Sequence, residues 1–320
     1  MTDGSRPRVA VLMGGRSAER EVSLNTGCEV GDALESLGWD VVRIDSGGAR
    51  FIDELRTSGA GVAFICLHGR FGEDGTVQGL LELLDLPYVG SPVLASALAM
   101  DKVMSKRIFT CEGIRTPEHV VLRRGSAEEE ARIVERLGER VVVKPASEGS
   151  SVGMHIVHER SELGGALEDA FAHDDVVLVE RFVPGVEVTV GVLGNERPTA
   201  LPTLEIVPAN EFYDYESKYM PGMSTHIIPA RIPEALREEC SRLAVEAHVA
   251  LGCRGMSRGD TIVAEDGTVY LLEVNTIPGM TKTSLLPDAA RAAGIEFPQL
   301  CEMLVRFALE DWQRRRGRES

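Results

Sequence analysis

The chain has 320 residues, and its 34 Lys and Arg stand against 50 Asp and Glu, a formal net charge of −16. This charge argues against a nucleic-acid binder, which needs a basic footprint, and against docking to an anionic membrane. No apolar run approaches the ~20 residues of a membrane span, and the first residues show no signal-peptide cleavage pattern. A chain of this length usually divides into two or three domains.

Six cysteines are scattered through apolar segments, at positions 28, 66, 111, 240, 253 and 301. None forms a C-x-x-C pair or a zinc-like cluster. Free cysteine behaves as a small hydrophobic residue. We therefore expect reduced, buried thiols in a cytoplasmic protein.

The first hundred residues alternate strand and helix patterns. Strands are expected at 8–13, 40–45, 61–66 and 87–89, and helices at 22–37 and 77–84. This rhythm predicts a parallel sheet with helices on its faces. Ligands of such sheets gather at the carboxyl ends of the strands, which here are followed by the segments 14–21 and 68–75.

The rest of the chain reads as α+β. Helices are expected at 102–111, 127–137 and 233–251, and strands at 119–122, 140–144, 153–158 and 176–180, with more strands from 188 onward. An aromatic loop, NEFYDYESKYMPGMSTH, follows these strands. Asp266-Gly267 then joins the strands expected at 255–263 and 268–274 as a hairpin.

Of three familiar sequence signatures, two are absent and the third lacks the structural context that it requires. The P-loop is absent because the chain has no Gly-Lys dipeptide, and G-x-G-x-x-G is missing after the first strand. The sequence GSSVG at 149–153 matches the nucleophile elbow of α/β-hydrolases. That elbow requires a turn from strand to helix, whereas the residues after it begin as a β pattern. A hydrolase is therefore disfavoured.

The same segment has a second interpretation. VVVKPASEGSSVGM is a strand carrying Lys144, then a Gly/Ser loop, then another strand. Consecutive backbone N–H groups can wrap phosphate oxygens, and a lysine supplies a point charge for phosphate. The alternative is a mobile hairpin with a surface lysine, and this motif alone leaves both open.

An acidic constellation lies on the expected hairpin. Asp260 is on one strand, and Glu273 and Asn275 are at the end of the next, two residues apart and hence on one face. Such oxygen ligands suit Mg²⁺, which is typically held by one or two carboxylates and substrate phosphates. The alternative is solvated strand ends, which the apolar neighbours disfavour because a buried sheet tolerates charge only with a partner.

Eight blocks together resemble the D-alanine–D-alanine ligases of the ATP-grasp superfamily. In chain order they are VAVLMGGRSAEREVSLNTG, CLHGRFGEDGTVQG, MDKVMSK, VVVKPASEGSSVGM, VLVERFVPGVEVTV, EFYDYESKY, SRGD and LLEVNTIPGMTKTSLLP. They run from residue 9 to 287. The resemblance implies a Rossmann-like substrate-binding α/β domain at 1–101. A two-part ATP-grasp α+β fold would follow, with a central domain at 102–187 and a C-terminal catalytic domain at 188–320.

The resemblance also implies a reaction, in which ATP and two D-alanines give D-alanyl-D-alanine, ADP and phosphate for peptidoglycan precursors. The first D-alanine carboxylate attacks the γ-phosphate to give an acyl phosphate. The amine of the second D-alanine then attacks that carbonyl through a tetrahedral intermediate. Catalysis of this kind is mainly positioning and charge neutralisation.

By resemblance, Glu19 holds the ammonium of the first D-alanine, and Ser150 and Tyr219 join it in a bridge that closes the loops. His68 lies near the carboxylate of the same substrate. Read alone, Glu19 is an ordinary acid at a helix start, and His68 an ordinary loop histidine.

The family pattern places cations around the phosphates and the tetrahedral oxyanion. Lys102, Lys144 and Lys218 would neutralise the triphosphate, and Arg258 with the backbone N–H of Gly279 would stabilise the oxyanion. Ser284 and Leu285 would bind the carboxylate of the second D-alanine. This last role has independent support, because helix N-termini favour anions.

The remaining roles by resemblance concern the nucleotide and the metals. The nucleotide would be held by Ser150, Ser151, Glu180, Arg181, Val183 and Glu187, with Glu180 and the backbone of Arg181 and Val183 at the adenine and Glu187 at the ribose. Asp260, Glu273 and Asn275 would hold two Mg²⁺ or Mn²⁺ ions. Relatives are commonly homodimers.

Two residues depart from the family pattern. Phe182 stands where many relatives carry Trp, which keeps an aromatic ring near the adenine. Gly259 stands where a β-branched residue is usual, so we expect a bulge or slack there. Tyr219, in contrast, keeps the pattern of ligases whose second substrate is an amine and not a hydroxy acid.

Two other interpretations compete. Another ATP-grasp carboxylate–amine ligase would keep the lysines and the metal ligands but not Glu19, Ser150 and Tyr219 together. A non-catalytic nucleotide-binding relative would lack Arg258 or a metal ligand, and all of these are present.

Overall fold

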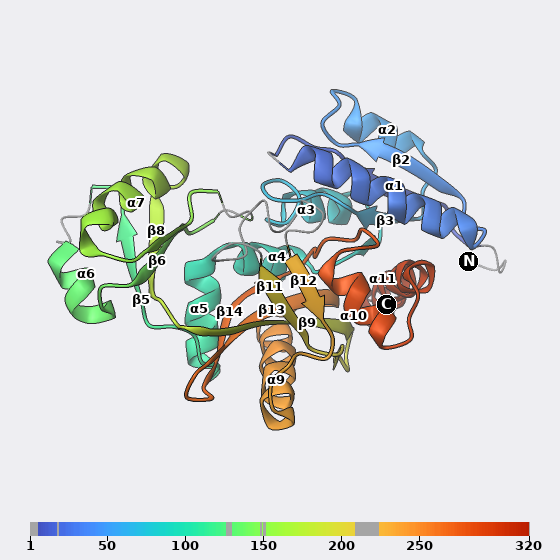
Figure 1. Ribbon diagram of the computed structural model, residues 1–320. Coiled ribbons are helices and arrows are strands. Elements are labelled where there is room, and N and C mark those ends of the chain that lie inside the picture. The colour runs from blue at the N-terminus through green and yellow to red at the C-terminus, as the bar shows by residue number, and fades with distance from the viewer. Residues whose placement is uncertain are drawn as a thin grey trace.

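Three β-sheets with their helices form the computed structural model (Figure 1), which describes residues 6–17, 19–125, 130–147, 149, 152–208 and 224–319. One sheet is parallel and two are antiparallel. The sheet of the central segment lies at one end of the molecule and the N-terminal sheet at the other, with the largest sheet between them. This arrangement confirms the expected Rossmann-like unit followed by an ATP-grasp α+β fold.

The N-terminal sheet has the strand order β2-β1-β3-β4. Its elements are β1 (Val9–Met13), α1 (Arg20–Ser36), β2 (Val41–Asp45), α2 (Phe51–Thr57), β3 (Val62–Ile65), α3 (Thr76–Leu83) and β4 (Tyr88–Val89). All pairings in it are parallel, as the strand–helix rhythm predicts. The sequence did not predict α2, because Leu55 is the only buried residue of this short helix and no apolar stripe marks it.

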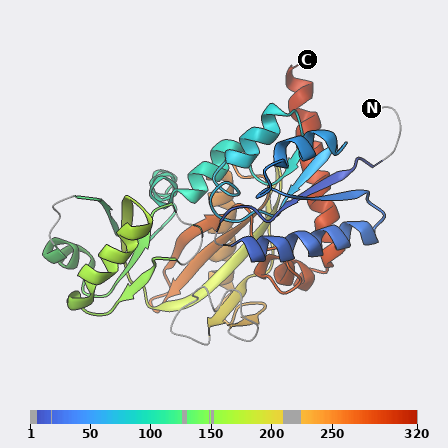
Figure 2. The same cartoon turned by 90° about the horizontal axis from the view of Figure 1, so that it is seen from above.

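The C-terminal helix shares the core of the N-terminal sheet. Helix α11 (Phe297–Glu319) places Leu300 and Leu304 in one apolar cluster with Val9 and Phe64 of strands β1 and β3. Figures 1 and 2 both show the red helix alongside the blue strands. The two ends of the chain are therefore packed together.

The central sheet has the order β5-β8-β6-β7 and is antiparallel. Its elements are β5 (His119–Arg123), α6 (Glu130–Leu137), β6 (Val141–Pro145), β7 (His155–Val157), α7 (Arg160–His173) and β8 (Val176–Arg181). The sequence did not predict α7, since Gly164-Gly165 interrupts its helical pattern. A capping box between Glu159 and Glu162 starts this helix and satisfies its first N–H groups.

The largest sheet has the order β12-β11-β9-β13-β14, with β10 paired to β9. Its strands are β9 (Gly185–Gly194), β10 (Thr199–Ala200), β11 (Leu204–Pro208), β12 (Ser224–Ile227), β13 (Gly255–Ala264) and β14 (Val269–Asn275). The associated helices are α4 (Val93–Met100), α5 (Lys102–Cys111), α9 (Glu234–Leu251) and α10 (Leu285–Ala292). Phe109 of α5 and Leu243 of α9 lie in the core of this sheet.

The expected irregularity near Gly259 is a register shift one residue further along. Asp260 pairs with Glu273, but Thr261 pairs with Leu271, so Leu272 is an extra, bulged residue on β14. Gly259 has a different role, because a Cβ there would lie 3.0 Å from the Cβ of Ala244. It lets α9 pack close to the sheet.

All six cysteines are free, but the expectation that all are buried is wrong for two of them. Cys28 and Cys111 are exposed because they lie on the solvent-facing sides of helices α1 and α5. Among the described helices, none is long and apolar enough to cross a bilayer.

Candidate active site

The expected metal ligands lie side by side on the β13–β14 hairpin, as the sequence predicts. The register sets Asp260 opposite Glu273, and Asn275 donates to Asp260 Oδ2 at 3.1 Å. Thr189 of β9 donates to the other carboxylate oxygen at 2.6 Å. Lys102, at the start of α5, places Nζ 3.6 Å from Glu273 Oε2. Two carboxylates and an amide oxygen thus gather beside a cation.

Arg258 extends this row of charges. It lies two residues before Asp260 on β13, so both side chains are on one face. The guanidinium donates to both oxygens of Asp260, at 2.8 and 2.7 Å. This bidentate pair fixes the direction of Arg258.

A buried carboxylate with two lysines lies beside the hairpin. Glu180, at the end of β8, forms ion pairs with Lys144 of β6 and with Lys106 of α5. Burial alone raises the pKa of Glu180, but the two ammonium groups outweigh burial and lower the pKa to about 2. Burial likewise lowers the pKa of Lys144, and the charges of Glu180 and Glu273 more than reverse this. Both groups are therefore ionised at neutral pH.

The loop before α10 leaves the first N–H groups of the helix without a side-chain cap. Ser284 Oγ is 2.8 Å from Thr281 Oγ1 and accepts from the Thr281 amide at 3.1 Å. The serine side chain therefore caps no N–H of the helix that begins at Leu285. A Cβ on Gly279 would lie 2.9 Å from Ser284 Oγ, so this backbone passes close to the same hydroxyl.

At the N-terminal sheet, two titratable residues lie in the loops that follow β1 and β3. Glu19, just before α1, and His68, after β3, are both buried. Among the described residues, His68 Nε2 has no hydrogen-bond partner, and burial lowers the pKa of this histidine so that it is neutral at pH 7. Gly69 lies between them, since a Cβ there would be 3.2 Å from Glu19 Oε2.

Comparison with known proteins decides the family. The profile described as D-ala D-ala ligase C-terminus matches residues 108–306, and the one described as D-ala D-ala ligase N-terminus matches residues 46–91. The chain belongs to the D-alanine–D-alanine ligase family. It is 53% identical over 310 residues to the D-alanine–D-alanine ligase of Pelotomaculum thermopropionicum, with 95% of this chain and 97% of that protein covered.

Solved structures agree with this membership of the ligase family. The Bacillus anthracis D-alanine–D-alanine ligase complexed with ATP has a TM-score of 0.84 and 35% identity, covering 97% of this chain and all of that one. The VanG D-Ala:D-Ser ligase of Enterococcus faecalis has a TM-score of 0.82 and 31% identity, covering 95% of this chain and 100% of that one.

Two residues that sequence reasoning did not assign lie within the ligase site. One is Lys106, the second lysine of the MDKVMSK block. The other is Glu73 in HGRFGEDG, whose buried carboxylate accepts from the Gly69 amide at 2.7 Å. Burial, reinforced by the charge of Glu19, raises the pKa of Glu73 to about 8. A Cβ on Gly149 would lie 3.2 Å from Glu73 Oε2, so the backbone of Gly149 lies close to this acid.

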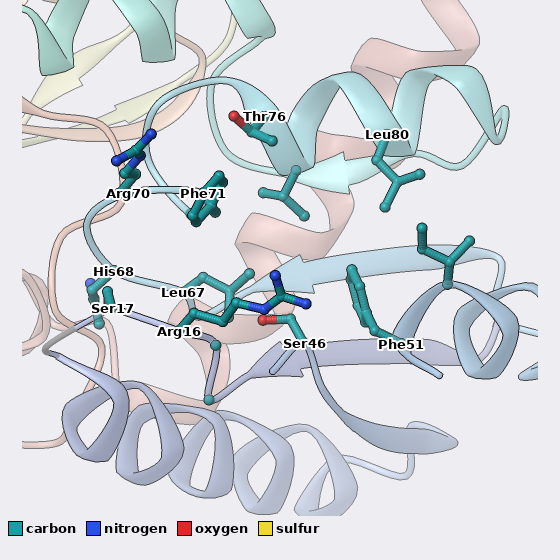
Figure 3. A pocket seen from close by; sticks show the side chains of 15 residues that line it. Arg16, Ser17, Ser46, Phe51, Leu67, His68, Arg70, Phe71, Thr76 and Leu80 are labelled. Atoms are coloured by element: carbon teal, nitrogen blue, oxygen red, sulfur yellow. The ribbon is translucent and has the colours of Figure 1, made fainter. Parts of the chain in front are cut away.

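A cavity of about 200 Å³ opens beside the first-substrate end, at the carboxyl ends of β1 and β3 (Figure 3). Ser17 and His68 line one side of it. In Figure 3, Phe51 and Leu80 lie on the opposite side, and Arg16 extends between the two sides. The parallel sheet thus places its hollow where the sequence predicts ligands to gather.

The residues expected at the base and ribose lie at the end of β8, in the connection from β8 to β9, and on β9. The Arg181 amide already donates to the Glu118 carbonyl at 2.8 Å. Val183 lies between β8 and β9, and Glu187 is on β9 opposite Ile262. The Phe182 ring lies 3.8 Å from the Arg140 guanidinium carbon.

Four expected site residues lie outside the described residues: Ser150, Ser151, Lys218 and Tyr219. Their roles stay predictions.

Proposed function

We propose that the chain ligates two D-alanines to D-alanyl-D-alanine with conversion of ATP to ADP and phosphate, the reaction of its family. The observation that carries this is the hairpin on which Asp260 faces Glu273 with Asn275 alongside, with Lys102 3.6 Å from Glu273. The arrangement supports a site in which carboxylates would hold metal ions beside a lysine that could contact phosphate. The acyl phosphate and the tetrahedral intermediate are the expected stages.

Oxygen donors on this hairpin match the preferences of Mg²⁺ or Mn²⁺. Asp260, Glu273 and Asn275 would hold two such ions, which when bound neutralise charge on the phosphates. Lys102, Lys144 and Lys218 would contact the triphosphate oxygens. Glu180, with Arg181 and Val183, would hold the adenine, Glu187 the ribose, and Ser150 and Ser151 the phosphates.

The amino-acid subsites are proposed to lie at the two loop ends. Glu19 would bind the ammonium of the first D-alanine, with Ser150 and Tyr219 closing over it. Neutral His68 lies on the neighbouring loop, and its Nε2 has no hydrogen-bond partner within the described part of the chain.

The second D-alanine would place its carboxylate at the N-terminus of α10, at Ser284 and Leu285, where the unclaimed N–H groups favour an anion. Arg258 and the Gly279 N–H would hold the oxyanion, as preorganised donors do.

The test is ADP release by the purified protein with ATP and Mg²⁺, with D-alanine or L-alanine added. We expect release with D-alanine and background release with L-alanine. ADP release that does not depend on a D-amino acid would overturn the proposal. Omission of Mg²⁺ and its replacement by Mn²⁺ test the metal assignment in the same assay.

We further propose that the second substrate is an amine and is D-alanine. Tyr219 carries this inference, and the similarity to a D-Ala:D-Ser ligase makes D-serine the competitor to include. Products formed from D-alanine mixed with D-serine or D-lactate at neutral pH should be mainly D-alanyl-D-alanine. Dominant depsipeptide or D-alanyl-D-serine would contradict the assignment.

The cellular setting proposed is the cytoplasm, where peptidoglycan precursors are made, and the assembly proposed is a homodimer. The absence of a disulfide among the six free cysteines supports a reducing compartment. Sedimentation at micromolar concentration tests the dimer, and a monomer mass would contradict it.

A further inference from the structure

Lys106 is the most deeply buried cation of the described chain, and its environment is built around its ammonium group. The residue is 0% exposed. Its Nζ donates to Thr116 Oγ1 at 2.5 Å and to the carbonyl of Leu272 at 3.1 Å, and it forms an ion pair with Glu180. An ammonium has three protons to donate, so three acceptors from three segments use all of them.

One of those acceptors exists because of the irregularity in β14. Leu272 is the bulged residue, and a bulge removes a carbonyl from the regular ladder. Lys106 takes up this carbonyl. The ammonium is thus held in place by backbone and hydroxyl groups that do not depend on a ligand.

Glu180 has two cationic partners, Lys106 and Lys144, and the two lysines differ in the other charges that they face. Lys144 also faces the charges of Glu273 and Glu187 and is the lysine proposed to contact phosphate. A lysine drawn toward a triphosphate no longer compensates the buried carboxylate fully. An uncompensated buried carboxylate takes up a proton, and a protonated acid is a poorer hydrogen-bond acceptor.

We propose that Lys106 is a positioning residue that keeps Glu180 ionised and correctly oriented for the nucleotide base while Lys144 serves the phosphates. This rests on the proposed role of Glu180 at the base. A carboxylate has about four lone-pair positions, so Glu180 can accept from an exocyclic amino group beside its two ion pairs. Lys106 contacts neither substrate nor metal and acts through Glu180.

The first experiment replaces Lys106 by methionine, which keeps the length and removes the charge. At saturating Mg²⁺ and D-alanine, KM for ATP in Lys106→Met should rise on the order of 10-fold or more, as for other residues that orient a ligand-binding group. KM for D-alanine should change less than about twofold. The preference for ATP over ITP, which lacks the 6-amino group, should also shrink.

A double-mutant cycle tests whether Lys106 acts through Glu180. Glu180→Gln alone should raise KM for ATP, and adding Lys106→Met should then change it little, because the group being oriented is already altered. Additive effects of the two substitutions would overturn the inference. An unchanged KM in Glu180→Gln would instead show that the proposed role of Glu180 is wrong.

Two further variants separate positioning from stability. Arg254→Met breaks another buried ion pair, with Asp311, outside the site, and should lower Tm without changing KM for ATP or the ATP/ITP preference. Thr116→Val removes one acceptor of Lys106. It should shift KM for ATP and the ATP/ITP preference in the same direction as Lys106→Met, but by less. This variant supplies the test if Lys106→Met does not fold. An unchanged ATP/ITP preference in a folded Lys106 or Thr116 variant would overturn the proposal.

Discussion

The two ends of the proposed site differ in the secondary structure that carries their residues and in the charge of those residues. At the end proposed to bind the nucleotide, the charged groups stand on strands and a helix and are already paired with one another, as in the ion pairs of Glu180 with Lys106 and Lys144. At the amino-acid end, the residues stand on loops at the edge of the parallel sheet. There burial lowers the pKa of His68, whose Nε2 contacts no hydrogen-bonding atom of the described residues, and burial raises the pKa of Glu73 to about 8.

This difference indicates how each end would select its ligand. Paired charges on rigid elements form a preorganised frame, into which an anion enters by exchange of partners. At the other end, close backbone contacts together with the proposed contact of Glu19 with the ammonium would select a small zwitterion by shape and by a few hydrogen bonds. Substitutions at the first end should therefore act through charge, and those at the second through geometry.

The largest effect is expected from a charge change at the nucleotide end. Glu273→Gln should lower the rate of ADP release about 100-fold or more at limiting Mg²⁺, since removal of one preorganised charge-stabilising group costs 10²–10³-fold. The Mg²⁺ dependence of the rate checks this. Glu265→Gln, on the exposed turn of the same hairpin, is the control. Full activity of Glu273→Gln at limiting Mg²⁺ would remove Glu273 from the metal site.

The next largest effect is expected from a change of shape at the end proposed to bind the first D-alanine. Gly69 has φ +67°, and a Cβ there would lie 3.2 Å from Glu19 Oε2. Gly69→Ala should therefore raise KM for the first D-alanine about 10-fold, since left-handed strain of 1–2 kcal/mol adds to displacement of Glu19. KM for ATP should stay unchanged. Gly59→Ala has the same strain, at φ +71° with no atom within 4 Å, and should leave both constants unchanged.

A smaller effect is expected at the start of α10. Ser284→Ala removes a hydroxyl that contacts Thr281 but leaves the helix N–H groups in place. Loss of one such hydrogen bond costs about 1 kcal/mol, so KM for the second D-alanine should rise about 5-fold. Initial rates at varied D-alanine check this. An unchanged KM would place the carboxylate of the second substrate elsewhere.

The smallest effect concerns stability. Folded Glu73 keeps its proton up to a pKa of about 8, against 4.5 in an unfolded chain. Between these values the folded state binds more protons, so stability falls as pH rises through this window. Glu73→Gln should abolish this contribution. From pH 6 to 8 the Tm of the wild-type protein should fall a few degrees more than that of the variant. The reason is that each pKa unit corresponds to ~1.4 kcal/mol in the free energy of unfolding. Parallel curves would show that Glu73 is ionised.

The sequence by itself determined the elements with a clear apolar pattern and the charged residues that the β13–β14 hairpin brings together. The strand–helix rhythm predicted the parallel sheet, and α5 follows the expected 102–111 residue for residue. The hairpin signal at Asp266-Gly267 fixed the pairing of Thr261 with Leu271, because a tight turn fixes the register of the strands it joins, and the bulge at Leu272 then sets Asp260 opposite Glu273. The domain boundaries and the roles of the individual site residues stay predictions.

Only the tertiary structure decided the features that depend on distant partners. The bulge at Leu272 and the packing of Ala244 against Gly259 arise where strands and a helix from separate segments meet. The pairing of Lys106 with Glu180 joins residues 74 positions apart, since 180 − 106 = 74. The charge states of His68 and Glu73 follow from burial, which the whole fold sets and no local pattern encodes.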